Sequence, residues 1–195
     1  MALSFLLPTH SEPKIVLRRV YLRPPVRGDW IKWVRIRSES REFLVPWEPT
    51  WPADALTKGA FRRRLSKYSE DWSEDKGYSF FIFRREDDAL IGGITLANVR
   101  RGVAQIASFG YWIGKSYARN GYMTESVRGA SGFAFDKLSL HRMEAACLPE
   151  NIASQGVLKK VGFNYEGLAR KYLKINGEWK DHMVFALLGE EFNRG

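Results

Sequence analysis

The pattern of apolar residues changes at Gly77, and this change limits the folds that the chain can adopt. Before Gly77, apolar residues recur at helical spacing from 54 to 72, which predicts an amphipathic helix. After it, runs rich in aromatic and β-branched residues alternate with short turn sequences, which is typical of strands. The predicted strands are 78–84, 90–99, 104–113, 142–148, 163–174 and 178–188, and the predicted helices are 30–41, 54–72, 123–138 and 151–161.

The N-terminal third adds further expectations. Residues 15–23 alternate well enough for a strand or a hairpin, and Gly28-Asp29 offers an N-cap for the first helix. Residues 43–52 contain three prolines, which remove backbone donors, so this segment is predicted to be a loop. Residues 1–13 are expected to form a flexible tail, and 14–195 a single domain.

The predicted order of elements favours one fold class. Hairpins of consecutive strands are mixed with two strand–helix–strand crossovers, the first through 123–138 and the second through 151–161. This order predicts an α/β domain with a mixed, mostly antiparallel sheet and helices on both faces.

Composition excludes several classes of protein. No apolar run reaches the roughly 20 residues that a membrane-spanning helix needs, and the apolar start lacks the basic region of a signal peptide. Cys147 is the only cysteine, so an internal disulfide is impossible, and the three histidines lack metal-ligand spacing. We therefore expect a cytoplasmic protein with no metal and no membrane partner.

Positive charge is concentrated near the N-terminus. The whole chain carries a net charge of +9, and residues 1–41 contain nine Lys or Arg against three acidic residues. A basic surface attracts polyanions such as nucleic acid, ribosomes and phosphorylated cofactors. The alternative interpretation is an ordinary solvated surface.

Residues 111–127 (YWIGKSYARNGYMTESV) place a glycine-containing loop directly before a helix. Backbone N–H groups at such a helix start, together with the helix dipole, can bind phosphate. The segment has neither the GxGxxG pattern of dinucleotide sites nor the Gly-Lys-Ser/Thr ending of a P-loop. A plain surface loop that leads into a packed helix is the alternative.

Two segments together resemble the GNAT family of acyl-CoA N-acyltransferases. The pyrophosphate loop of that family reads roughly Gln/Arg-x-x-Gly-x-Gly/Ala, and the matching window is ARNGYM at 118–123. A downstream family pattern matches at Asn151, Ser154 and the Gly162-Phe163 pair. The Rim-type subgroup, which acetylates the N-termini of ribosomal proteins, is most similar, through YWIG (111–114), GFNYEG (162–167), NGEWKD (176–181) and WEP (47–49).

The resemblance implies acetyl-CoA as co-substrate and a set of residues that hold it. A β-bulge should separate two strands and expose backbone that binds the pantetheine arm, and the loop amides should bind the pyrophosphate. Asn151 should bond to the pantetheine side or cap its helix, and both roles can coexist. The implied cofactor-binding residues are Tyr111, Trp112, Ile113, Gly114, Arg119, Asn120, Gly121, Tyr122, Met123, Thr124, Asn151 and Ser154.

The implied reaction is direct attack of an amine on the thioester. Ser154 is the candidate for donating a hydrogen bond to the leaving thiolate. The alternative is that Ser154 is only a small helix residue that allows close packing. Glu48 and Asp181 are candidate bases, and each can instead have a structural role, such as pairing with an arginine. Trp47, Glu48 and Trp51 are expected to form part of the acceptor slot.

Three functions remain open from the sequence. The first is a Rim-type N-acetyltransferase, monomeric or homodimeric, that acts on a protein N-terminus, with a ribosomal protein that begins with alanine as the expected acceptor. The second is a GNAT enzyme for a small amine such as a polyamine, amino acid or antibiotic. The third is a non-catalytic module that binds RNA or the ribosome, which would leave the glycine loop and the Asn151–Ser154 spacing unexplained.

Overall fold

A computed structural model describes residues 13–192 of the chain. The predicted tail therefore lies outside the described residues, except for Pro13. The strands are β1 (Ile15–Val16), β2 (Val20–Arg23), β3 (Tyr78–Arg84), β4 (Leu90–Arg100), β5 (Ile106–Ile113), β6 (Arg142–Cys147), β7 (Asn164–Ile175) and β8 (Glu178–Leu188). The α-helices are α1 (Trp30–Glu39), α2 (Arg41–Leu44), α3 (Lys58–Ser73), α4 (Tyr122–Asp136) and α5 (Ile152–Val161), and the 3₁₀ turns are η1 (Arg27–Asp29), η2 (Val45–Trp47) and η3 (Lys115–Tyr117).

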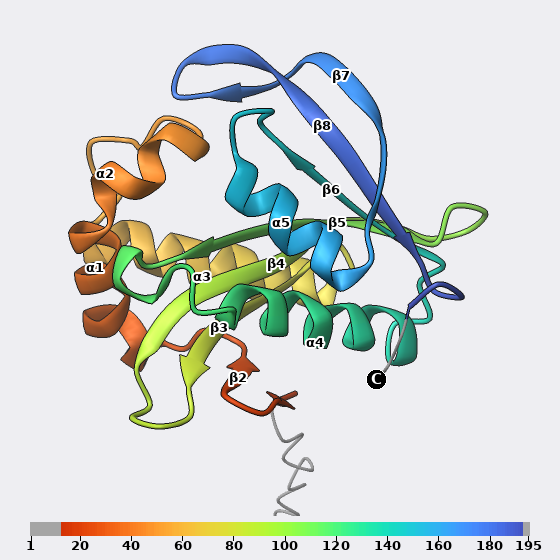
Figure 1. The fold of residues 1–195 in the computed structure, drawn as a ribbon. Helices are drawn as coiled ribbons and strands as arrows, with labels where there is room; N and C mark the ends of the chain where they lie inside the picture. The colour runs from red at the N-terminus through yellow and green to blue at the C-terminus, as the bar shows by residue number, and fades with distance from the viewer. Residues whose placement is uncertain (1–12, 193–195) are drawn as a thin grey trace, which may run out of the picture.

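The eight strands form one mixed sheet, in the order β1-β2-β3-β4-β5-β6-β8-β7. Within residues 13–192, only β5 and β6 pair in parallel, and every other neighbouring pair is antiparallel. Because β8 is antiparallel to both β6 and β7, β7 runs parallel to β6 with β8 between them (Figure 1). Both predicted crossovers are therefore present, and the predicted fold class is confirmed.

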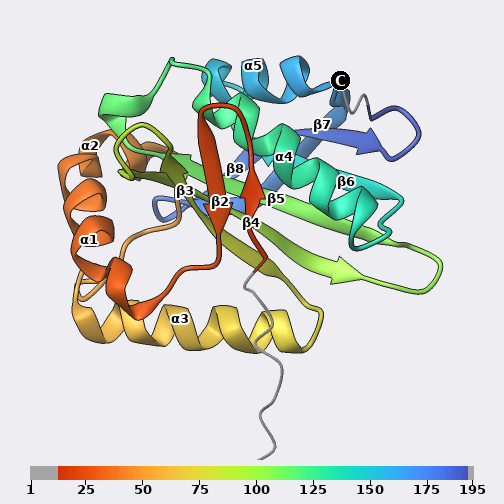
Figure 2. The same cartoon turned by 90° about the horizontal axis from the view of Figure 1, so that it is seen from below.

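Helices cover both faces of the sheet, and the strand sequences explain why. In Figure 2, α3 lies on one side of the sheet, and α4 and α5 lie on the other. On β3, Phe80 and Ile82 belong to the cluster packed by α4, whereas Phe81 and Phe83 pack with residues of α1 and α3. A strand that is buried on both faces must be apolar at successive positions, which is why YSFFIFR lacks polar alternation.

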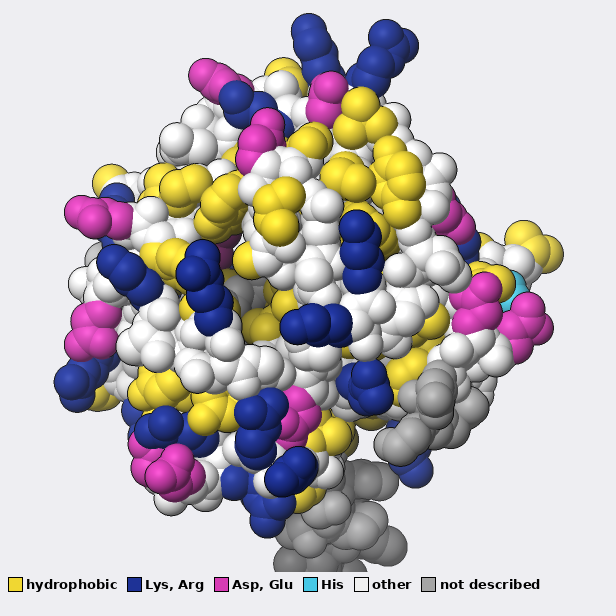
Figure 3. All heavy atoms as spheres, in the orientation of Figure 1, with side chains coloured by type: hydrophobic (Ala, Val, Ile, Leu, Met, Phe, Trp, Pro, Cys, Tyr) yellow, Lys and Arg dark blue, Asp and Glu magenta, His cyan; other side chains and the backbone are white. Residues whose placement is uncertain are grey.

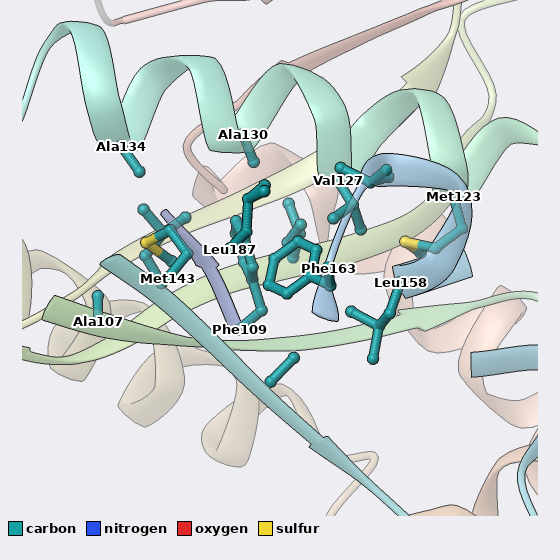
Figure 4. Close-up of a cluster of buried hydrophobic side chains, with 14 of the residues drawn as sticks. Ala107, Phe109, Met123, Val127, Ala130, Ala134, Met143, Leu158, Phe163 and Leu187 are labelled. Atoms are coloured by element: carbon teal, nitrogen blue, oxygen red, sulfur yellow. The ribbon is translucent and has the colours of Figure 1, made fainter. Parts of the chain in front are cut away.

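The main core lies beneath α4 (Figure 4). Met123, Val127, Ala130 and Ala134 recur at helical spacing and are all at most 5% exposed, so they form the apolar face of this helix. In the figure, Met123 lies beside Leu158 of α5. Alanine on α4 lets the helix approach the sheet closely, so the helix is fixed rigidly against the strands below it.

Three local predictions need correction. The proline-rich segment 43–52 was predicted to be a loop, but it begins in α2 and η2, because Pro46 sits at the start of η2, where a missing N–H costs nothing. The helix predicted from residue 54 begins at Lys58, and Thr57 caps it by accepting from the Ala60 N–H. Asp29 occupies the N-cap position of α1 without capping it, since its carboxylate instead pairs with the Arg23 guanidinium.

A glycine on β4 is needed for the close approach of β4 and β5. A Cβ atom at Gly92 would lie 2.5 Å from the Trp112 carbonyl oxygen. We predict that Gly92→Ala lowers the free energy of unfolding by about 1–3 kcal/mol, as overpacking does. Urea unfolding followed by circular dichroism measures the loss.

Gly110→Ala on β5 is the matched control, because a Cβ atom there would meet nothing within 4 Å. Its unfolding free energy should stay within about 0.5 kcal/mol of the unchanged chain. Equal effects of the two substitutions would contradict the packing described here.

Candidate functional site

The sheet opens between β5 and β6. Their parallel pairing runs from Ile106 opposite Arg142 to Phe109 opposite Ala145 and ends there, although both strands continue. Beyond that point β5 stays paired with β4 as far as Ile113, and β6 stays paired with β8 as far as Cys147. The two central strands therefore separate, which leaves one edge of each without a strand partner.

The β-bulge implied by the family resemblance is not found where the end of β5 pairs with β4. The register shift between β4 and β5 lies between Ala97 and Arg100, and the pairing from Gly92 to Ala97 is regular. The opening arises instead because β5 stays paired with β4 while β6 stays paired with β8. Neighbouring strands in a sheet twist relative to each other, so the ends of these two pairs diverge.

Backbone groups on the open edge of β5 point toward the gap. The Gly114 N–H donates to the Ile91 carbonyl of β4 at 2.9 Å. Since backbone groups along a strand alternate in direction, Gly114 and Trp112 face β4, whereas Tyr111 and Ile113 face β6. Two of the four predicted pantetheine-binding residues on this strand thus present their N–H and C=O groups to the opening.

The α4 helix begins beside the continuation of β5. Gly121 is its N-cap, in the left-handed conformation with φ of 77°, and no side chain caps the helix. The N–H groups of Tyr122, Met123 and Thr124 lie in the first turn, where a helix offers its own amides no acceptor. Helix dipole and free amides together make this end suited to an anion.

Arg19 lies at the same place, and sequence analysis did not single it out. Its Nε donates to Glu125 of α4 at 2.8 Å, its Nη1 donates to the Asn120 carbonyl at 2.9 Å, and its guanidinium lies over the Tyr122 ring. A Cβ atom at Gly121 would lie 3.2 Å from Arg19 Nη2. Because it bonds both to Glu125 and to the Asn120 carbonyl, the guanidinium ties the loop before α4 to the first turn of that helix.

Ser154 and Tyr111 meet across the opening. The Tyr111 hydroxyl of β5 and the Ser154 hydroxyl of α5 are 2.7 Å apart. Burial raises the pKa of Tyr111 above its ordinary value of 10, so the phenol stays protonated at neutral pH. Burial also raises the pKa of Cys147 on β6, so this residue stays a thiol rather than a nucleophilic thiolate.

Asn151 has the capping role that was predicted as one of its two possibilities. Its Oδ1 accepts from the Ser154 N–H at 3.0 Å at the start of α5. This contact fixes the first turn of α5 and with it the position of the Ser154 side chain.

The Glu48 carboxylate is fully engaged within the protein. It accepts two hydrogen bonds from the Arg37 guanidinium, at 2.7 and 2.6 Å, and one from Trp51 Nε1 at 2.7 Å. Arg37 is 7% exposed, and its guanidinium also lies over the rings of Trp51 and Trp112. Of the two roles considered for Glu48, the structure shows the arginine pairing, which holds the 47–51 loop against β5.

Asp181 also has a structural contact. Its Oδ1 accepts from the Lys171 N–H at 2.8 Å, where the β7–β8 register shifts between Ala169 and Leu173. The carboxylate thereby satisfies a backbone donor in the irregular stretch of β7.

The long β7–β8 hairpin reaches across to the 47–51 loop. Asn176 and Gly177 form the turn between β7 and β8, and the Asn176 N–H donates to the Glu48 carbonyl at 3.0 Å. In Figure 1 the hairpin passes above the gap beside α5, and Figure 3 shows the surface hollowed below it. Trp47 (37% exposed) and Trp179 (61% exposed) belong to these two segments.

Two further observations concern other kinds of site. Within residues 13–192, no group of three or more His, Cys, Asp and Glu side chains is arranged to hold a metal ion. In the same part of the chain, no helix has the length and apolar character needed to cross a membrane.

Comparison with known proteins identifies the family. The model of the acetyltransferase (GNAT) domain matches residues 19–164. A probable N-acetyltransferase, YjcK of Bacillus subtilis, is 40% identical over 174 residues, which cover 89% of this chain and 96% of that protein. The ribosomal protein uS5-alanine N-acetyltransferase of Escherichia coli is 31% identical over 158 residues, 81% of each chain.

A solved structure shares the fold closely. Mycobacterium smegmatis RimJ, in complex with CoA-disulfide, superposes with a TM-score of 0.83 at 33% sequence identity, covering 88% of this chain and 83% of that one. The family match, these relatives and this shared fold confirm the resemblance inferred from the motifs: the chain belongs to the GNAT family and is an N-acetyltransferase of Rim type.

Proposed function

We propose that this enzyme transfers the acetyl group of acetyl-CoA to the N-terminal amine of a protein, in the cytoplasm, as a monomer or homodimer. A ribosomal protein with N-terminal alanine is the proposed acceptor. The observation that carries the proposal is the opening between β5 and β6, with an anion-binding helix start on one side and a slot under the β7–β8 hairpin on the other.

The opening suits the shape and charge of acetyl-CoA. The backbone groups of Tyr111 and Ile113 would hold the pantetheine arm as an added strand, which satisfies groups that β6 leaves unpaired. The amides of Arg119, Asn120, Gly121, Tyr122, Met123 and Thr124 are the proposed cradle of the pyrophosphate. Arg19 would hold the loop of that cradle in place through its bonds to the Asn120 carbonyl and to Glu125.

The chemistry needs little more than positioning. The amine nitrogen attacks the thioester carbonyl, the C–N bond forms, the C–S bond breaks, and the amine loses a proton to water. An α-amine has a pKa of roughly 8, so a useful fraction is already neutral at pH 7 without a strong base. A backbone N–H on the open edge of β5 would polarise the carbonyl as charge develops.

Ser154 is the proposed donor to the leaving thiolate. Since the Tyr111 hydroxyl stays protonated, it can donate to Ser154 Oγ and leave the serine proton free for sulfur. Tyr111 would thus act as a positioning residue behind Ser154. Glu48 and Asp181, which are already engaged with Arg37 and Lys171, would shape the acceptor slot rather than remove a proton.

The slot favours a protein N-terminus over a polyamine. A polycation would need unpaired carboxylates, and Glu48 is paired with Arg37. The exposed Trp47 offers an apolar wall for the first side chains of a peptide. Relatives named as alanine N-acetyltransferases of ribosomal protein uS5 support the same class of acceptor.

The phosphate assignment is tested at Gly121. We predict that Gly121→Val loses acetyl-CoA binding at least 10-fold, because the side chain would occupy the approach to the backbone beside Arg19. Isothermal titration calorimetry measures the affinity. Gly102→Val is the matched control, since Gly102 also has a positive φ (64°) but no atom within 4 Å of an added Cβ. Parallel losses in both variants would mean that backbone strain alone explains the effect.

The role of Ser154 is tested by steady-state kinetics. Ser154→Ala should lower kcat by on the order of 10-fold or more and leave the acetyl-CoA Kd unchanged, because the bond to sulfur strengthens only as charge develops. The helix cap survives this change, since Asn151 bonds to the backbone N–H. Tyr111→Phe should also lower kcat, whereas Ser66→Ala on α3 should not. A loss of cofactor affinity equal to the loss of rate would refute a role in the transition state.

The acceptor is tested by mass spectrometry of the acetylated products. Peptides that begin with alanine or serine should be acetylated in preference to spermidine and to a lysine side chain in an N-terminally blocked peptide. Efficient turnover of a small amine with inert peptides would instead establish the small-molecule function. If the protein did not bind acetyl-CoA at all, the result would favour the third function, a non-catalytic module that binds RNA or the ribosome.

A further inference from the structure

A groove lies between η1 and the Lys58 to Ser69 part of α3, and Figure 2 shows η1 next to the start of α3. It consists of two hollows of about 290 and 540 Å³ that share Arg27 and Arg62. None of the residues that line the β5–β6 opening, the start of α4 or the 47–51 loop lines either hollow. The groove is therefore a separate feature of the surface.

The charged residues that line the groove are all positive. Arg27, Lys58 and Arg62 line it, all three are exposed, and no acidic residue lines either hollow. Among residues 13–192, no carboxylate pairs with any of the three. The nearest acids in the sequence, Asp29 and Asp54, pair with Arg23 and Arg63 instead. Uncompensated cations in a hollow attract phosphate.

Apolar and hydroxyl groups complete the lining. Trp30 and Phe61 line the smaller hollow, with ring centroids 5.6 Å apart, and Ser66 and Ser69 line the larger one. From Lys58 to Ser69 the groove follows twelve residues of α3, a rise of about 16 Å along the helix axis. That length exceeds a single phosphate and suits a short run of nucleotides.

We propose that this groove binds single-stranded RNA. Grooves that bind single strands combine cations that contact the phosphates with aromatic or guanidinium planes on which bases stack. Arg27, Lys58 and Arg62 supply the cations, and Trp30 supplies the aromatic ring. A phosphorylated peptide would use the cations but has no regular row of planar bases to stack on an aromatic ring. The proposal does not depend on the acetyl acceptor, because the groove and the opening share no residue.

Fluorescence anisotropy with a labelled 12-nucleotide single-stranded RNA tests the proposal on the full chain. The double variant Arg27→Gln/Arg62→Gln should bind the RNA at least 10-fold more weakly than the unchanged chain. Its plot of log affinity against log salt should be shallower by about 1.4, or roughly 0.7 for each lost phosphate contact. Acetyl transfer to a short peptide should be unchanged, which also shows that the variant is folded.

The matched control removes two positive charges elsewhere. Arg100→Gln/Lys137→Gln alters two exposed residues outside the groove and should change RNA affinity less than 2-fold. Equal losses in both double variants would overturn the proposal, because the attraction would then be one of net charge only. RNA binding too weak to measure, or tighter groove-dependent binding of a doubly phosphorylated peptide than of RNA, would overturn it as well.

Discussion

The central feature of this structure is the end of hydrogen bonding between β5 and β6 after Phe109 and Ala145. A buried strand edge with unpaired N–H and C=O groups is costly unless another group satisfies it. Here both strands remain anchored, β5 to β4 and β6 to β8, so the gap is built into the sheet and cannot close by a small shift. A ligand that offers backbone-like donors and acceptors is the natural partner for such an edge.

The surrounding elements are placed around that gap by long-range contacts. The apolar face of α4 fixes one wall, Asn151 fixes the start of α5, and the Arg37–Glu48 pair holds the 47–51 loop against Trp112. Arg37 is buried, so removing Glu48 would leave an uncompensated charge. The pair thus gives the acceptor side of the site a defined shape.

Sequence patterns predicted the sheet, the crossovers and the glycine loop, because periodicity and turn residues are local signals. They did not reveal Arg19, which reaches Glu125 and the Asn120 carbonyl from the β1–β2 turn, since no local pattern encodes a contact across a hundred residues. The N-terminal charge count was also ambiguous. Arg19, Arg23, Arg35 and Arg37 each pair with a carboxylate of the same chain, whereas Arg27 pairs with none among residues 13–192. Net charge in a sequence segment therefore overstates the free charge on its surface.

Amide hydrogen exchange with and without coenzyme A tests the central claim most directly, because it reports on the backbone groups themselves. Exchange should slow at the amides of Tyr111 and Ile113 and at those of Tyr122, Met123 and Thr124. Exchange at Gly114, whose N–H already donates to Ile91, should stay as it is. Unchanged exchange along β5 and at the start of α4, with protection elsewhere, would contradict the account of the opening as the coenzyme site.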